Sequence, residues 1–170
     1  MLTKIADEIS VFLTELHNKS LKTGDVPEDW KLANVTPIFK KGKRSNSANY
    51  RPVCLTIILC KVLESLIGDK VIDHLYKLIK DTQHGFVKNR SCLTNLLVFL
   101  EEVTNYVDSG YPVDIIYLDF LKAFDKVPHK RLLHKLAAHG IGGELLLWIE
   151  NWLSGRKQRV RPTLNGQCSS

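Results

Sequence analysis

The sequence predicts an α+β fold in which helices pack on a small, incomplete sheet. Several stretches carry apolar side chains every three to four positions, the spacing of one helix face. Shorter runs of β-branched and aromatic residues, bounded by glycine and proline, are typical of strands. Hydrophobic residues make up 44% of the 170 residues, which indicates a globular chain and not a disordered one.

The first elements predicted are one helix and two short strands. Residues 4–22 carry apolar side chains at helical spacing, and Gly24 ends this helix. Residues 33–39 alternate as a strand does, and Pro37 confines that strand to an edge or a bulge. Residues 53–55 form the second short strand.

Two long helices are expected next. Thr56 can cap a helix that runs to about residue 78, and Gly68 is a point where it can break. Ser91 caps a second helix that runs to about residue 108. The apolar face of this second helix consists of Leu93, Leu96, Leu97, Leu100, Val103 and Val107.

The C-terminal part is predicted to hold two more helices. Pro128 begins one that Gly140 ends. The other covers residues 144–153, where Trp148 and Trp152 lie one turn apart and are expected to be core residues and not a base-stacking platform.

A basic stretch with strand-like alternation closes the sequence. It covers residues 156–161, and Asn165-Gly166 after it is a hairpin turn signal.

The stretch from residue 113 to 125 organises the chain. Its apolar run ends at Asp119, which predicts a buried strand over 113–119 with a carboxylate at its end. A carboxylate on a stiff element suits a hard metal ion. An Asp at a strand end also commonly caps the next helix, so spacing alone leaves both interpretations open.

Charge is concentrated in a basic loop. Lys40, Lys41, Lys43 and Arg44 lie between the two predicted strands, and Arg51 follows them. Such a tip suits a phosphate clamp, and a solvated loop without a partner is the alternative. The net charge of +6 and the pI near 9.1 favour a polyanionic partner only weakly.

The four cysteines include no C-x-x-C pair and no zinc-site spacing. The N-terminal stretch, residues 1–8, carries the acids Asp7 and Glu8 where a signal peptide is apolar, and no apolar run reaches a membrane span of roughly 18 residues. The expectation is an intracellular protein with free thiols and no membrane partner.

Four blocks, in this order, make the chain resemble the reverse transcriptase of non-LTR retrotransposons, the long interspersed element or jockey-like type. The resemblance covers about residues 24–166, nearly the whole chain. The blocks are 26–42 (with Pro37-Ile38-Phe39-Lys40-Lys41-Gly42), 49–53 (Asn-Tyr-Arg-Pro-Val), 83–91 (with Gln-His-Gly-Phe) and 117–125 (Tyr-Leu-Asp-Phe-Leu-Lys-Ala-Phe-Asp).

The resemblance implies part of a right-hand polymerase. Residues from about 24 to 110 would be fingers with connecting helices, and residues from about 111 to 170 the start of the palm. The family activity is templated DNA synthesis on an RNA template from a DNA primer, with deoxynucleotides as substrates. The chemistry is two-metal nucleotidyl transfer with Mg²⁺.

The resemblance also assigns roles to single residues. Asp119 would be the catalytic metal ligand, and the backbone carbonyl of Phe120 a second ligand. Phe124 would crowd the sugar 2′-OH of the incoming nucleotide. Lys40 and Arg51 would neutralise its triphosphate. The expected nucleic-acid contacts are Lys41, Gln83, Gly85, Phe86 and Arg90.

The sequence departs from the family pattern in several places. Val87, Leu121 and Cys54 replace residue types usual in the family, which resembles drift in a decayed element. No adjacent Asp pair occurs, although the family's second palm hairpin carries one, and Mg²⁺ needs several anionic oxygens. A truncated polymerase inactive by itself is therefore expected. A non-catalytic nucleic-acid-binding remnant and a reading frame without a stable fold are the alternatives.

The predicted strand over 113–119 would also lose its neighbour, because that hairpin is not encoded here. The strand is expected at or near an exposed sheet edge, where unpaired backbone groups favour aggregation.

Overall fold

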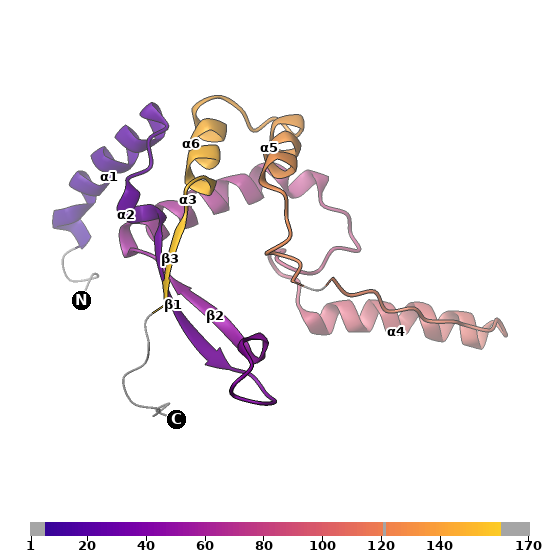
Figure 1. Ribbon diagram of the computed structural model, residues 1–170. Coiled ribbons are helices and arrows are strands. Elements are labelled where there is room, and N and C mark those ends of the chain that lie inside the picture. Colours follow the sequence, from indigo (N-terminus) through magenta and orange to yellow (C-terminus); the bar gives the residue numbers. More distant parts are fainter. Residues whose placement is uncertain (1–5, 121, 161–170) are drawn as a thin grey trace. The chain divides into compact units, whose positions relative to one another are not determined.

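A computed structural model describes residues 6–120 and 122–160 (Figure 1). The described residues divide into two compact units. The first unit consists of the residues up to 71 together with those from 127 on, and the second unit consists of residues 72–126. Helices and one three-stranded sheet make up the regular structure, so the α+β prediction is confirmed at this level. No helix in the described part is long and apolar enough to span a membrane.

The sheet of the first unit has the strand order β2-β1-β3. Strand β1 (Leu32–Phe39) pairs antiparallel with β2 (Tyr50–Leu55) and parallel with β3 (Lys157–Val160) (Figure 1). Ala33 and Val35 are buried at alternate positions, as the period of two of a strand requires. The strand predicted over 33–39 is confirmed, the one predicted over 156–161 is confirmed for residues 157–160 with residue 161 outside the described residues, and β2 begins three residues before its predicted start.

Pro37 lies in the two-stranded part of this sheet. Among the described residues, β3 pairs with β1 from Leu32 to Val35, so Pro52 on β2 is the described strand partner of Pro37. A proline has no backbone N–H to donate to a ladder. Within the described residues the sheet is therefore two-stranded at Pro37, in agreement with the expected edge position, although β1 is the middle strand.

Five helices belong mainly to the first unit, and their most buried side chains form its core. Trp148 and Cys60 are almost completely buried. Trp30, Leu63 and His17 are also buried, although they come from different helices along the chain. The helices are α1 (Ala6–Thr23), α2 (Glu28–Lys31), α3 (Ile58–Leu75), α5 (His129–Ala138) and α6 (Gly143–Leu153).

Two stacked indole rings on α6 connect this core. The rings of Trp148 and Trp152 lie 6.1 Å apart at an interplanar angle of 13°. The Trp148 indole N–H donates to the Ser20 hydroxyl at 2.9 Å, and the Trp152 indole N–H donates to Glu64 Oε1 at 2.9 Å. Buried indoles need such acceptors. The prediction that this aromatic pair is core is confirmed for Trp148, while Trp152 is half-buried.

A buried lysine joins three segments of the same unit. Lys31 Nζ donates to Asn151 Oδ1 at 2.5 Å, and Asn151 Nδ2 donates to the Gly24 carbonyl at 2.9 Å. Gly24 has φ +70 directly after α1, a conformation that glycine adopts without strain. The glycine thus ends the first helix as predicted.

Helix α3 differs from its predicted form in two ways. It begins at Ile58, so Thr56 does not cap it, and it continues through Gly68 without a break. The last predicted turn is the 3₁₀ helix η3 (Tyr76–Leu78). A single glycine costs a helix only about 1 kcal/mol, which packing of Leu63 and Cys60 offsets.

The second unit is built around α4 (Cys92–Asp108). The Ser91 hydroxyl accepts from the Thr94 amide at 3.2 Å, and the Thr94 hydroxyl accepts from the Ser91 amide at 2.9 Å. This reciprocal pair is a capping box, so the predicted cap is confirmed. Most of the predicted apolar face of α4 is exposed, namely Leu93, Leu96, Leu97, Leu100 and Val107.

The prediction of a buried strand over 113–119 is wrong. Residues 111–120 form no regular secondary structure, and Ile116, Tyr117 and Leu118 are at least 80% exposed. A strand is stable only when a neighbour pairs with its backbone groups. No described segment pairs with this one, although its residue types favour a strand.

Two sequence predictions lie outside the described residues. These are the turn at Asn165-Gly166 and the free thiol of Cys168. The other three cysteines are free thiols, as expected.

Cys60 should resist thiol reagents while the chain is folded. Burial, and next the hydrogen bond from its Sγ to Glu64 Oε1 at 3.1 Å, raises the pKa of this thiol from 9.0 to about 12, and only the thiolate reacts. At pH 8, iodoacetamide should modify the exposed Cys54 and Cys92 first, as peptide mass spectrometry would measure. Similar rates at Cys54 and Cys60 would contradict the assignment.

The same shift has a consequence for stability. The unfolded chain loses this proton at a lower pH than the folded chain does. The contribution of Cys60 to the free energy of unfolding is therefore complete below pH 9 and is lost as the pH rises towards 12.

Candidate functional site

The basic tip of the β1–β2 hairpin is a turn held by several internal hydrogen bonds. The Lys40 amide donates to the Asn49 carbonyl at 2.8 Å, Asn49 Nδ2 donates to the Lys43 carbonyl at 2.9 Å, and the Tyr50 hydroxyl donates to the Arg44 carbonyl at 2.8 Å. Gly42 has φ +92, and a Cβ there would lie 2.7 Å from Asn49 Nδ2, so the turn requires glycine.

Three predicted phosphate-binding cations project from this hairpin. Lys40, Lys41 and Arg51 are exposed, and none makes a side-chain hydrogen bond or ion pair with a described residue. Arg51 lies opposite Ile38 in the strand register, so both arms of the hairpin carry charge. Arg44 differs, because its guanidinium lies 5.2 Å above the Phe39 ring and supports the turn.

In the second unit, the loop between η3 and α4 carries the predicted template-side residues. Gln83 Nε2 donates to the Gly85 carbonyl at 3.0 Å, and Phe86 is 87% exposed with φ +60. A left-handed backbone is uncommon for an aromatic residue. Arg90 points inward, with its side chain 23% exposed.

The predicted catalytic segment is exposed in the same unit. Asp119 and Phe120 lie in the irregular stretch, and Asp119 makes no hydrogen bond with a described residue. No helix follows it directly, because residues 122–126 form turns and α5 begins at His129. The interpretation of Asp119 as a helix cap is therefore wrong.

The structure brings two of the predicted site residues together. The rings of Phe86 and Phe124 meet edge to face, with centroids 5.8 Å apart and an interplanar angle of 88°. Phe124 is 78% exposed. Two aromatic residues 38 positions apart thus form one exposed pair, which sequence spacing could not predict.

A metal site was expected at Asp119, with Mg²⁺ as the cofactor. Among residues 6–120 and 122–160, no three or more His, Cys, Asp or Glu side chains gather as metal ligands would. One carboxylate does not fit Mg²⁺, which binds through several oxygens in octahedral geometry. The described residues by themselves therefore do not form the expected site.

The comparisons with known proteins decide the family. Residues 38–169 match the model of the family described as reverse transcriptase (RNA-dependent DNA polymerase). This chain belongs to the reverse transcriptase family. The resemblance drawn from the four sequence blocks is thereby confirmed.

Relatives of this reverse transcriptase segment come from non-LTR mobile elements. It is 30% identical to the RNA-directed DNA polymerase from mobile element jockey of Drosophila melanogaster, over 98% of this chain and 18% of the relative. It is 28% identical to the probable RNA-directed DNA polymerase from transposon BS of the same fly, over 74% and 14%.

A further relative is the Pol polyprotein from type-1 retrotransposable element R2 of Popillia japonica. It is 26% identical, over 83% of this chain and 20% of the relative. The chain therefore spans at most about a fifth of the length of these relatives.

One departure from the reverse transcriptase pattern has a packing reason. Val87 is buried, with 8% of its surface exposed. An apolar residue suits that position, so drift is not needed to explain it. Cys54 is exposed on β2, and nothing in the structure explains that replacement. Leu121 lies outside the described residues.

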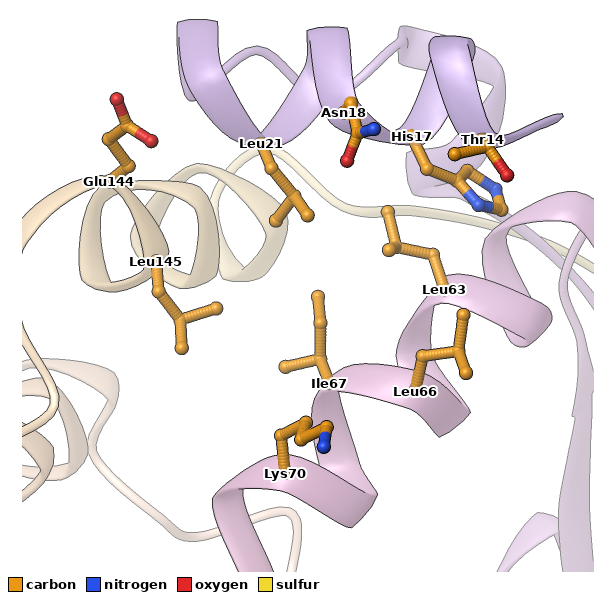
Figure 2. Close-up of a pocket in the computed structure, with 10 residues that line it drawn as sticks. All are labelled: Thr14, His17, Asn18, Leu21, Leu63, Leu66, Ile67, Lys70, Glu144 and Leu145. Atoms are coloured by element: carbon orange, nitrogen blue, oxygen red, sulfur yellow. The ribbon is translucent and has the colours of Figure 1, made fainter. Parts of the chain in front are cut away.

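A hollow in the first unit of this reverse transcriptase segment lies away from every predicted site residue. It has a volume of about 430 Å³ and lies between α1, α3 and α6. Figure 2 shows Leu21, Leu63 and Ile67 pointing into it, with Lys70 and Glu144 at its sides. Its lining is mainly apolar, and none of the family blocks contributes to it.

The irregular stretch before Asp119 should limit the solubility of the isolated chain. Ile116 and Leu118 are 82% and 89% exposed, and exposed apolar segments with unpaired backbone favour association. Replacing both with Thr should raise the concentration at which light scattering detects aggregates. The urea midpoint should stay unchanged, because neither side chain is buried.

The control for this comparison is Leu63→Thr. That side chain is 2% exposed, so its replacement should lower the midpoint. A lowered midpoint in the Ile116→Thr, Leu118→Thr variant would show instead that the segment is packed.

Proposed function

We propose that this chain is the fingers and the beginning of the palm of a non-LTR retroelement polymerase, with fingers over residues 24–110 and palm from residue 111. On its own it binds nucleic acid but does not copy it. The family match over residues 38–169 carries this proposal. It is supported by the exposed cations of one unit and the exposed carboxylate of the other.

The hairpin cations are proposed to bind the incoming deoxynucleotide. Lys40 and Arg51 are exposed beside an ordered turn, so their charges are available to a triphosphate without first breaking another contact. Arg presents a planar fork and Lys a compact charge, and both are usual phosphate partners. Lys41, next along the turn, is proposed to contact the nucleic-acid backbone.

Phe124 is proposed to exclude ribonucleotides. Its ring is exposed and is held from one side by Phe86. An edge-to-face contact is worth about 0.5–1.5 kcal/mol, so it favours this position of the ring, where an added 2′-hydroxyl would meet it. Gln83, Gly85 and Phe86 are proposed to face the template strand.

Asp119 is proposed as one ligand of the catalytic Mg²⁺, with the carbonyl of Phe120 beside it. The remaining anionic ligands are not among the described residues, so these two groups would be necessary without being sufficient. This argument favours a second candidate function, a nucleic-acid-binding remnant without catalysis. RNA template, DNA primer and deoxynucleotides are the proposed partners of the complete enzyme.

Asp119 should be necessary for synthesis, and the 170-residue chain should not be sufficient. Primer extension on an RNA template with Mg²⁺ should give no product with this chain. A chimera that adds the remaining polymerase of a related element should give product. Asp119→Asn in the chimera should abolish it, because the amide keeps the shape but removes the charge that a metal needs.

The control in that assay is Asp114→Asn in the same chimera, an exposed carboxylate five residues earlier. Extension by the unmodified chain would contradict insufficiency. Activity of the Asp119→Asn chimera would contradict the metal assignment and favour the remnant.

Neutralising Lys40 and Arg51 together should flatten the salt dependence of binding to an RNA–DNA duplex. Without a bound deoxynucleotide, both side chains are proposed to contact backbone phosphates instead of the triphosphate, and if each contacts one, the slope of log K against log salt should fall by about two. Fluorescence anisotropy across a salt series measures this slope. The matched control is Lys130→Gln with Arg131→Gln, an exposed pair of the same charge on α5, and its slope should not change.

An unchanged slope in the Lys40, Arg51 variant would mean that the hairpin does not touch the backbone. The basic stretch at residues 156–161 would then be the better candidate.

A further inference from the structure

The loop over residues 79–90, here called the anchored loop, is organised from inside by one side chain. Arg90 Nη1 donates to the carbonyl oxygens of Lys80 at 3.3 Å, of Asp81, and of Gln83 at 2.8 Å. Three carbonyl oxygens within four residues therefore converge on one guanidinium nitrogen.

Backbone contacts complete the anchored loop. The Gln83 amide donates to the Lys80 carbonyl at 3.0 Å, and the Arg90 amide donates to the Val87 carbonyl at 3.3 Å. Phe86 and Asn89 both have left-handed backbones, with φ +60 and +62. Such conformations persist where the surroundings hold them, and the Arg90 guanidinium is a charged donor bonded to three carbonyls of this loop.

The ion pair that Arg90 also makes is the weaker part of the arrangement. Arg90 Nη2 lies 3.1 Å from Asp81 Oδ1, but the Asp81 side chain is fully exposed. Exposed pairs contribute little to stability. The three carbonyl contacts therefore explain the inward position of Arg90 better than the carboxylate does.

Both N–H groups of Arg90 Nη1 are used by the loop carbonyls and one of Nη2 by Asp81, so three of the five guanidinium donors are occupied and fewer are left for a phosphate. The side chains of Lys40, Lys41 and Arg51 make no hydrogen bond to a described residue, in contrast to that of Arg90. We propose that Arg90 is a positioning residue. It builds the anchored loop through three carbonyls and thereby holds Gln83 and Phe86 in the shape that meets nucleic acid, and it does not bind a phosphate itself.

That the anchored loop contacts nucleic acid rests on the proposed function. The role of Arg90 in holding the loop together does not. The first experiment therefore needs no nucleic acid. Hydrogen exchange by mass spectrometry should show at least about tenfold faster exchange of residues 79–90 in Arg90→Lys, because the ammonium keeps the charge but ends a shorter side chain and lacks the rigid fork that places Nη1 among these carbonyls. Exchange in β1 and β2 should not change.

Two controls separate the carbonyl contacts from charge. Asp81→Asn removes the ion pair and keeps every carbonyl, so exchange should change less than about threefold. Lys88→Gln removes an exposed cation two residues away, which pairs only with the exposed Asp73, and should leave the anchored loop unchanged. Exchange that is equal in Arg90→Lys and the unmodified chain would overturn the anchor.

The second experiment measures binding of a single-stranded RNA oligonucleotide across a salt series. Arg90→Lys and Arg90→Gln should both weaken binding several-fold with no change of slope. A lost phosphate contact would reduce the slope by about 0.7, and recovery of full affinity by Lys would indicate a charge role. Either result would overturn the proposal.

The two failures can be told apart. If the chain binds no RNA at low salt, the proposed function fails together with the part of this inference that concerns RNA. The hydrogen exchange result still decides whether Arg90 anchors the loop.

Discussion

Two stacked indole rings on one face of α6 join the helices of the first unit to one another. Trp148 donates its indole N–H to Ser20 at the end of α1, and Trp152 donates to Glu64 on α3. Neither ring can shift without leaving a polar group unpaired, which costs about 1–3 kcal/mol when buried. The hollow between the same three helices therefore coexists with a defined core.

The same stack leads from the helices to the sheet. The Arg156 guanidinium lies 4.5 Å from the centre of the Trp152 ring, and β3 begins at the next residue. Strand β3 pairs with the buried start of β1, while the far half of β1 extends with β2 as a ribbon to the basic tip. The cations that the proposed function assigns to the triphosphate thus stand at the end of an element anchored in the core.

The second unit is stabilised differently. Among described residues 72–126, Val87 is the buried hydrophobic side chain, so apolar burial contributes little there. Hydrogen bonds replace it: the capping box of Ser91 begins α4, and Arg90 gathers the carbonyls of the preceding loop. Local contacts of this kind stabilise a loop without a large core. They hold the Phe86 ring against Phe124 while both remain exposed.

The sequence by itself determined the features that depend on neighbours along the chain: the helices, the cap at Ser91, the glycine at the end of α1 and the family blocks. Tertiary structure decided what depends on distant partners. The run ending at Asp119 has strand residues but no ladder partner among the described residues, and Arg90, expected from the sequence to contact nucleic acid, donates to three carbonyls of its own loop. Which side chains are charged can be read from the sequence. Whether a charged side chain is already bonded to backbone carbonyls depends on which segments the tertiary structure places beside it.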